Sequence, residues 1–308
     1  MDITKTQLNI NHLKMICTIA KSETVKEAAE SLFITQPALT NRIREAERRL
    51  NTSLFVRRGR KLIISNAGKR LLHSAKKILE ELGRAEYDIA RLSDGVEQVL
   101  RIGLPHYASF KWLPAVTSYF AKELPNIELE ITAAAAKRPL NALFNGDVDI
   151  AMISSSQQKL SLDENLYESS FLLQDELMAC LSKDHKKAER NHLVAEDFID
   201  ETYITNSTIP EKDREYELFF QPENVLPRKV LQVGFNEAIL ELTKVNLGVT
   251  IMSKHLVSPY LENGMIRTVP LGEQGLKIYW HLVYLKQGKI AKPAKVLTTI
   301  LKQYANES

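Results

Sequence analysis

The most constraining feature of the sequence is a long amphipathic helix in its first third. From Asn66 onward, apolar residues recur at spacings of four and three; they are Leu71, Ala75, Ile78, Leu82, Ala85, Ile89 and Leu92. A helix of about 26 residues is roughly 39 Å long, and a seam of this kind is buried only by a partner surface. We therefore predict a linker helix over residues 66–92 that dimerises the chain. Packing of the seam on the chain's own C-terminal domain is the alternative.

The composition is that of a folded protein in water. Of 308 residues, 44% are hydrophobic and 26% are charged, as in globular domains, and the length suits two or three compact units. No apolar run could cross a membrane, and the first residues lack the features of a signal peptide. Cys17 and Cys180 form no paired motif. We expect a cytoplasmic protein without membrane contact.

Charge is divided unevenly along the chain. Residues 1–92 hold 18 of the 41 lysines and arginines but only 10 of the 38 aspartates and glutamates, a net charge of +8, which leaves −5 for residues 93–308. A basic module attracts polyanions and an acidic module is repelled by them. The division favours nucleic acid as the partner of the first third; chance surface charge is the alternative.

A helix-turn-helix pattern lies in this basic region. We predict short helices over about His12–Lys21 and from Thr24 to Leu32, and a third that begins at Gln36-Pro37, where proline suits the first turn. The third helix has an apolar stripe of Leu39, Ile43, Ala46 and Leu50, opposite a polar face of Pro37, Thr40, Asn41, Arg44 and Arg48. Such a helix can present Gln36, Thr40 and Asn41 to base edges in a major groove. A merely solvated helix is the alternative.

A basic hairpin is predicted directly after these helices. The apolar runs 54–56 and 62–64 flank the segment Arg57-Arg58-Gly59-Arg60-Lys61. Four cations at a hairpin tip repel one another unless a polyanion is nearby, so the hairpin is typical of a wing that contacts phosphates or a minor groove. A solubilising loop is the alternative.

The acidic remainder alternates between strand-like and helical segments. The expected strands are Val99–Leu104, Ile127–Thr132, Val148–Ser154, Leu177–Ser182, Val230–Gly234, Val249–Ser253 and Ile278–Leu285. This alternation predicts parallel sheets covered by helices, here as two α/β lobes with a cleft between them. Ligand loops are expected at His106 to Ser109, Ala133 to Lys137, and Thr205 to Thr208, where hydroxyls and backbone N–H groups could hold a carboxylate.

Catalytic and metal motifs are missing from the sequence. It contains no nucleophile elbow, no phosphate-binding loop of the Walker type and no zinc-binding His-Glu-x-x-His helix. His185 and His192 lie in a charged loop, where a metal site is not expected, and Asp147 and Asp149 suit a turn better than acid–base chemistry. We therefore expect no enzyme, no catalytic residue, no metal and no cofactor.

The motifs together resemble the LysR-type transcriptional regulators. The resemblance is carried by Leu13 through Ile16, Ala28 through Leu32, Thr35 through Thr40, Ile43, Glu47, Leu50, Leu54-Phe55, Arg57 and Ala67-Gly68. It continues through Leu100 to Gly103, Leu113-Pro114, Pro125 to Leu129, Gly146 to Ala151 and Leu247 to Val249. The resemblance thus covers almost the whole chain.

The resemblance implies an architecture and a set of partners. It implies an all-α winged helix-turn-helix over 1–65, the linker helix over 66–92, and an α/β effector domain over 93–308. The effector domain would have two Rossmann-like subdomains, similar to type 2 periplasmic binding proteins: I at about 97–166 and 267–308, and II at about 167–266. Double-stranded promoter DNA and a homodimer or homotetramer follow as partners, with RNA polymerase as a further candidate. A small anionic metabolite would bind in the cleft.

Site residues are transferred from the family position by position. DNA contacts are expected at Gln36, Pro37, Ala38, Thr40, Asn41 and Arg42, and at Arg57, Arg58 and Arg60 of the wing. Effector contacts are expected at His106, Tyr107, Ala108, Ser109, Ala134, Ala135, Thr205, Asn206 and Ser207. Asn41 stands where the family commonly has arginine, so adenine replaces guanine as the base expected there.

Two questions remain open at this level. Trp112-Leu113-Pro114, with Phe219 to Pro222 and Pro227, is most similar to the methionine-biosynthesis regulators, which implies homocysteine as effector. The competing functions are a solute-binding module that uses residues 1–92 only to oligomerise, and an enzyme on the same scaffold.

Overall fold

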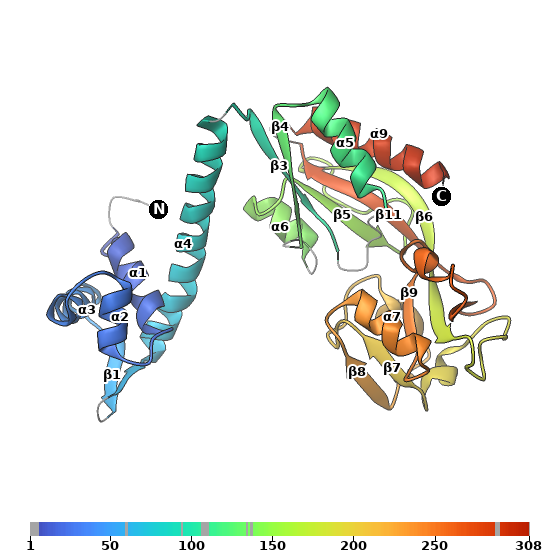
Figure 1. Cartoon of the computed structure of the whole chain (residues 1–308), viewed down its shortest axis with the longest axis horizontal. Coiled ribbons are helices and arrows are strands. Elements are labelled where there is room, and N and C mark those ends of the chain that lie inside the picture. The colour runs from blue at the N-terminus through green and yellow to red at the C-terminus, as the bar shows by residue number, and fades with distance from the viewer. Residues whose placement is uncertain are drawn as a thin grey trace. The chain divides into compact units, whose positions relative to one another are not determined.

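The computed structural model describes residues 6–58, 61–93, 95–105, 111–133, 135, 138–286 and 290–307. The chain divides into two compact units, Met1–Gly95 and Val96–Ser308, and each is described by itself (Figure 1). Among the described residues, no helix is both long and apolar enough to span a membrane.

The N-terminal unit is a winged helix-turn-helix followed by a long helix. Its elements are α1 (Ile10–Ile19), α2 (Val25–Ser31), α3 (Gln36–Leu50), β1 (Phe55–Arg58), β2 (Lys61–Ile64) and α4 (Asn66–Ser93). The Thr24 hydroxyl caps α2 by accepting from the Glu27 N–H, and Thr35 caps α3 by accepting from the Ala38 N–H. The three predicted short helices are therefore confirmed, with ends shifted by one or two residues.

Small and large apolar side chains pack these helices together. Ala28 and Ala29 of α2 are buried, which lets α2 pack closely, and Met15, Ile16 and Leu39 fill the space between the helices. The antiparallel hairpin β1–β2 is joined to α4 at Gly68, where an added Cβ would lie 2.2 Å from the Leu54 carbonyl oxygen. Only glycine fits at that approach of helix to strand.

The first turns of α4 pack on the chain's own helix-turn-helix, which corrects part of the predicted seam. Ala75 is fully buried, and Leu71 packs with it against the core that contains α1. Further along the helix, the seam residues Ile78, Ile89 and Leu92 are exposed. The apolar pattern is therefore divided: Leu71 and Ala75 pack in the core of the N-terminal unit, whereas Ile78, Ile89 and Leu92 are exposed.

The C-terminal unit is built around one curled sheet. Its described strands follow the order β10 (Ile266–Pro270), β6 (Tyr167–Ser182), β11 (Leu276–Leu285), β5 (Ile150–Ser155), β3 (Gln98–Gly103) and β4 (Ile127–Thr132), and β9 (Thr250–Ser253) pairs with β6. Pairing is parallel among β3, β4 and β5, but antiparallel wherever β6 or β11 takes part. The expectation of purely parallel sheets is therefore wrong for the centre of this unit.

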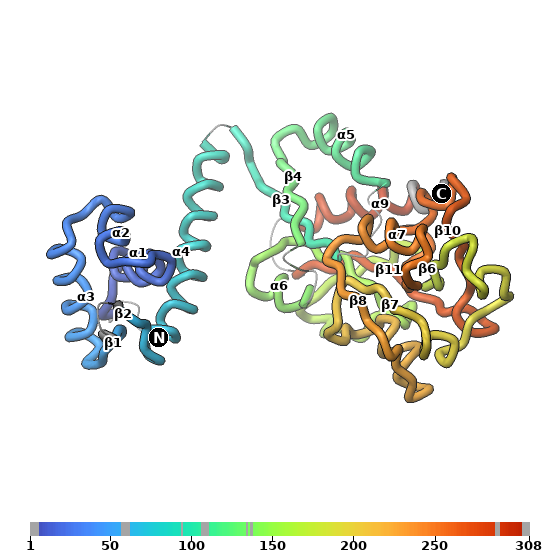
Figure 2. The backbone as a smooth tube through the Cα atoms, turned by 60° about the horizontal axis from the view of Figure 1, so that its bottom comes forward, coloured from blue at the N-terminus to red at the C-terminus, as the bar shows by residue number. Residues whose placement is uncertain are grey.

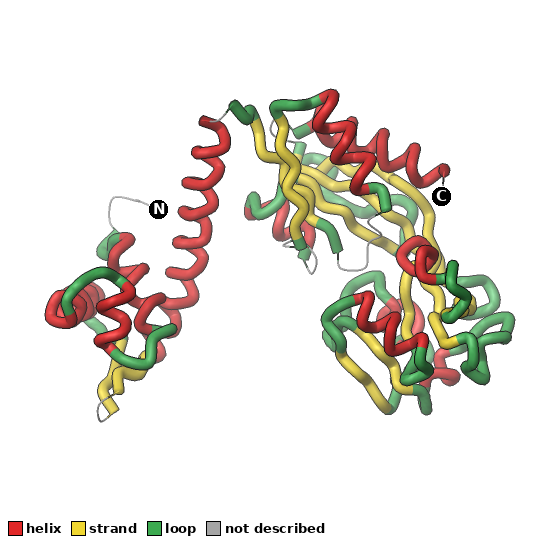
Figure 3. Tube along the Cα trace, viewed as in Figure 1, coloured by secondary structure: helices red, strands yellow, loops and turns green. Residues whose placement is uncertain are grey.

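Helices cover both faces of the sheet in subdomain I. Helices α5 (Leu113–Glu123) and α9 (Ala291–Glu307) pack on one face, and α6 (Pro139–Asn145) packs on the other; Figure 3 shows these helices in red beside the yellow strands. Val116 and Phe120 of α5 meet Leu297 of α9 in the larger core. Trp112, which precedes α5, is buried in the same core.

Subdomain II is smaller and has its own core. It contains the parallel pair β7 (Thr202–Thr205) and β8 (Lys229–Gln232), with α7 (Asn236–Lys244), α8 (Lys254–Val257) and the short helices η2 (Ala195–Phe198), η3 (Tyr216–Phe220) and η4 (Ser258–Tyr260). Figure 2 shows β7 and β8 side by side. Cys180 is buried in this core, and burial raises the pKa of its thiol to about 12.

The long strands β6 and β11 meet at a buried polar cluster. Asp175 of β6 accepts a hydrogen bond of 3.1 Å from the Trp280 indole of β11, and Nδ1 of His255 in α8 lies 2.9 Å from its carboxylate. Burial acts to raise the pKa of Asp175, but His255, the Glu176 N–H and Trp280 outweigh burial and leave the pKa below its ordinary value. The ionised carboxylate therefore stabilises the junction of β6, β11 and α8.

We predict that Asp175→Asn lowers the free energy of unfolding of the C-terminal unit by about 3 kcal/mol at pH 7, because removing one partner of a buried pair leaves the other uncompensated. The folded pKa lies below the unfolded one, so this stabilisation is full above the unfolded value of about 3.9 and is lost as pH falls. Urea unfolding at pH 7 and at pH 3 tests this, with the exposed Asp184→Asn as control. If Asp175→Asn lowered the free energy of unfolding by the same amount at pH 7 and at pH 3, the lowered pKa of Asp175 would be contradicted.

Candidate nucleic-acid interface and ligand cavities

The first turn of α3 is an exposed surface made of small polar groups. Gln36, Pro37, Ala38 and Asn41 are exposed, whereas Leu39 and Ile43 on the opposite side are buried. Thr40 is partly buried, and its hydroxyl donates to the Gln36 carbonyl at 3.0 Å. The side chains free to approach a groove are therefore those of Gln36 and Asn41, both of which can bond bidentately to adenine.

Helix α3 is fixed to its surroundings by its acidic residues. Glu47 accepts hydrogen bonds of 2.8 and 3.1 Å from the N–H groups of Leu54 and Phe55, which ties the start of the wing to the helix. Glu45 pairs with Arg49 at 2.6 Å and lies 3.7 Å from the buried His12. Glu45 and Glu47 are therefore both engaged by neighbouring groups. The exposed Arg44 and Arg48 keep the outer face of α3 basic.

The wing residues are only partly described. Arg57 and Arg58 belong to β1, but their side chains, like Arg60 as a whole, lie outside the described part of the structure. Arg42 is partly buried rather than fully exposed. The backbone thus forms the expected hairpin, and the phosphate contacts of its tip stay a prediction.

A cavity of 470 Å³ lies between the two subdomains; we call it the cleft cavity. Subdomain I contributes Pro105, Arg138 and the run Ser154–Gln157 at the carboxyl end of β5, and subdomain II contributes Glu211, Lys212 and Asp213. The carboxyl ends of parallel strands are where open α/β sheets bind ligands. Its hydroxyls, backbone N–H groups and two cations suit a small carboxylate.

One hydrogen-bonded link crosses the cleft cavity. Asp213 accepts from the Ser156 hydroxyl at 2.5 Å and from the Ser156 N–H at 3.2 Å, although the two residues are 57 positions apart. Asp213 has a φ of 56°, in the left-handed region. The carboxylate of the protein therefore occupies donors that could also hold the carboxylate of a ligand.

A second cavity, of 360 Å³, lies inside subdomain II; we call it the subdomain II cavity. Its polar side includes Thr205, Arg214 and Glu215, and its apolar side includes Tyr216 and Phe220 of η3. Burial and Glu215 raise the pKa of Tyr203 well above its ordinary value, so its hydroxyl stays protonated and donates to Glu215 at 3.1 Å. This cavity is distinct in lining from the cleft cavity, although Glu211 borders both.

The structure describes four of the nine expected effector residues. Thr205, Asn206 and Ser207 line the subdomain II cavity, and the Thr205 hydroxyl is bonded within its own turn, to the Ser207 carbonyl at 3.1 Å. Ala135 is buried against Gly103. His106, Tyr107, Ala108, Ser109 and Ala134 lie outside the described residues.

The sequence matches family models in both units. Residues 10–69 match the model described as bacterial regulatory helix-turn-helix protein, lysR family, and residues 93–306 match the LysR substrate binding domain. The chain belongs to the LysR family of transcriptional regulators. It is a DNA-binding regulator with an effector-binding domain, and its matched relatives are transcriptional regulators rather than enzymes.

Individual relatives of this LysR regulator cover most of its length. The transcriptional regulator MetR of Haemophilus influenzae is 27% identical over 88% of this chain and 86% of the relative, and CfxR of Cupriavidus necator is 22% identical over 97% and 93%. Among solved structures, full-length CbnR in complex with its target DNA has a TM-score of 0.68 at 16% identity, covering 96% of this chain and 99% of CbnR. The regulatory domain of MetR from N. meningitidis has a TM-score of 0.60 at 21% identity, covering 68% and 94%. The structural likeness shows the fold of the LysR regulators.

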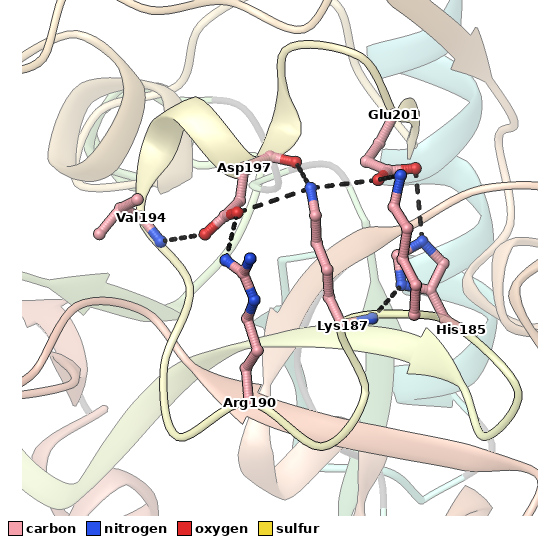
Figure 4. A network of polar contacts seen from close by, with 7 residues as sticks. His185, Lys187, Arg190, Val194, Asp197 and Glu201 are labelled. Atoms are coloured by element: carbon pink, nitrogen blue, oxygen red, sulfur yellow. Dashed lines mark hydrogen bonds and ion pairs between the residues drawn. The ribbon is translucent and has the colours of Figure 1, made fainter.

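The charged loop of the regulator around His185 is a structural network (Figure 4). Lys187 pairs with Glu201 at 3.1 Å and donates to the Asp197 carbonyl, and Arg190 pairs with the Asp197 carboxylate at 2.6 Å. His185 accepts from the Lys187 N–H through Nδ1, so its Nε2 carries the proton directed at Glu201, 3.3 Å away. Burial acts to raise the pKa of Glu201, but these neighbours hold it below its ordinary value. No metal-binding group of three or more His, Cys, Asp or Glu residues occurs among the described residues.

Most residues of the cleft cavity were not predicted from the sequence. The run Ser155-Ser156-Gln157 directly follows the predicted strand Val148–Ser154, which was the signal for a polar strand end. The sequence around Lys212 and Asp213 contains no comparable pattern, because only the tertiary fold brings these residues to the cavity.

We predict that Gln36→Ala and Arg44→Ala weaken DNA binding in different ways. Loss of the Gln36 amide should cost about 1–3 kcal/mol on the preferred operator and relax the sequence preference, whereas loss of Arg44 should weaken all sequences alike and lower the salt slope by about one. Binding of the full chain to operator and random duplex over a salt series measures both effects. Lys122→Ala, exposed in the other unit, is the control. Uniform weakening by both variants would contradict the assignment of base reader and phosphate contact.

Proposed function

We propose that the regulator binds promoter DNA as a homodimer or homotetramer and that a small carboxylate in the cleft cavity changes its operator affinity or geometry. The observation that carries the ligand part is the Ser156–Asp213 link, which joins the two subdomains at a site suited to a carboxylate. RNA polymerase is a further proposed partner at the promoter. Sequencing the genomic fragments retained by the purified protein tests the DNA function and shows which genes lie beside the operators.

Dimerisation through α4 is supported by its exposed apolar residues. Ile89 is 62% exposed, and Ile78 and Leu92 lie on the same seam. An apolar helical seam exposed to water is stabilised by pairing with a second copy. Two copies would present two α3 helices to two half-sites, which gives specificity to short recognition helices.

We predict that the double substitution Ile78→Glu and Ile89→Glu weakens dimerisation at least tenfold, because it places carboxylates on the apolar seam. Affinity for a full operator should fall with it, while the weak affinity for a single half-site should stay the same. Analytical ultracentrifugation and operator binding measure the two effects. Lys77→Glu, which adds a carboxylate outside the seam, is the control. A double variant with unchanged mass and operator affinity would contradict dimerisation through this face.

The charges of the cleft cavity support a carboxylate ligand. Within the described part of the chain, neither Arg138 nor Lys212 forms an ion pair, whereas the Asp213 carboxylate is engaged by Ser156. A ligand carboxylate could pair with a cation, and an amino group could approach Glu211. Homocysteine, implied by the resemblance to the methionine-biosynthesis regulators, has both groups and is the first metabolite to test.

We predict that Arg138→Ala weakens homocysteine binding about tenfold, because a charge-assisted hydrogen bond is worth about 1.5–3 kcal/mol. Asp213→Asn should strengthen binding, because it removes a negative charge that competes for the Ser156 donors. Calorimetry on the full chain measures both affinities, and operator binding without ligand should be unchanged in Arg138→Ala.

The control is Arg228→Ala, since Arg228 is exposed in subdomain II and pairs with Asp200 outside the cavity. Equal affinity in wild type, Arg138→Ala and Asp213→Asn would place the ligand outside the cleft cavity. Failure of homocysteine alone, with other small carboxylates bound in an Arg138-dependent way, would reject the metabolite and retain the site.

A further inference from the structure

The subdomain II cavity has a mouth of exposed apolar residues. Ile209, Leu226 and Val230 line it and are 66%, 59% and 50% exposed. Large apolar side chains gathered around a concave opening mark a binding surface more often than scattered ones do. At 360 Å³ the cavity has the size of a small-molecule site.

The polar end of this cavity is already assembled. Arg214 is only 6% exposed, and its Nε donates to the Glu215 carboxylate at 2.9 Å; the Tyr203 hydroxyl donates to the other oxygen of Glu215. A carboxylate has about four acceptor positions, so Glu215 can accept one more hydrogen bond. The cavity therefore offers an acceptor at its polar end and aromatic and aliphatic walls elsewhere.

One wall of the subdomain II cavity contains an irregular helical turn of a kind found at functional sites. Tyr216–Phe220 form a π-helical turn, closed by a hydrogen bond of 2.8 Å from the Gln221 N–H to the Tyr216 carbonyl. Such turns are rare and occur frequently at functional sites. This turn places Tyr216 and Phe220 in the lining, and Phe220 is held by edge-to-face contacts with Phe198 and Tyr203. One wall is thus rigid, and the rim residues stay exposed.

We infer that the subdomain II cavity is a second small-molecule site, which takes a neutral aromatic compound with one N–H or O–H donor. The ring would lie between the rim and η3, and its donor would bond to Glu215. Two carboxylates, of Glu211 and Glu215, line the cavity with one guanidinium, that of Arg214, so a ligand carboxylate is disfavoured there. This ligand class differs from the one proposed for the cleft cavity, and the inference stands whether or not that proposal holds.

The test uses indole as the probe and the full chain as the protein. We expect calorimetry to show saturable binding of indole to wild type and at least tenfold weaker binding to Leu226→Trp, which fills the mouth. Leu247→Trp is the matched control, because Leu247 is 58% exposed in the same subdomain but does not line the cavity. Val230→Trp fills the mouth from another side and serves as the second variant if Leu226→Trp does not fold.

Two further measurements locate the probe and define its chemistry. Arg138→Ala should leave indole affinity unchanged, because Arg138 lines only the cleft cavity. Benzoate, which carries a charge and no donor, should bind at least tenfold more weakly than indole. The inference is overturned if indole does not bind at its solubility limit, or if the filled variants bind it like Leu247→Trp. Loss of binding in Arg138→Ala, or equal binding of benzoate, overturns it as well.

Discussion

The pairing of β6 with β11 is the constraint on which the effector domain depends. The strands pair from Leu276 with Leu177 to Leu285 with Tyr167, so together they belong to both subdomains. A bulge between Trp280 and His281 shifts their register, close to the contact of Trp280 with Asp175. A bulge bends a strand and increases its local twist. The two subdomains are therefore joined by a continuous, bent ribbon fastened by a buried carboxylate. The cleft cavity is lined by the end of β5, the strand that pairs with β11.

In the N-terminal unit, helix α4 packs in the unit's core at its start and carries exposed apolar residues further along. A helix with an apolar stripe along its whole length cannot be assigned to one partner from periodicity alone, because burial by its own domain and burial by a second copy need the same side chains. The structure resolves this by position. Ala75 is buried beside α1, whereas Ile89 remains exposed, so the base of α4 is part of the DNA-binding unit and only its later turns are available to a partner.

The parts that could be predicted are those governed by local patterns. Thr24 and Gln36-Pro37 marked helix starts, and the strands β3, β4, β5, β9 and β11 lie within two residues of their predicted ranges or inside them. The expected strands did not include β7, β10 or the first ten residues of β6. The stretch Tyr167–Ser170 at the start of β6 mixes polar and aromatic residues without a clear alternation. The cleft cavity could not be predicted from the sequence for another reason. Its Ser156–Asp213 link depends on tertiary folding across 57 positions, which no local pattern encodes.

The segment from Ile209 to Glu215 connects the chemistry of the two cavities. Glu211 lines both, Asp213 closes the cleft cavity onto Ser156, and the next two residues form the polar end of the subdomain II cavity. An occupant of either cavity would thus restrain the same few residues. Coupling between two binding sites is reciprocal in free energy. If a ligand in one cavity orders this segment and changes the affinity of the other cavity by some factor, a ligand in that other cavity changes the affinity of the first by the same factor. Because Asp213 holds a left-handed conformation within this segment, its position depends on the contacts that surround it, and its contact with Ser156 is the one that a ligand in the cleft cavity would exchange.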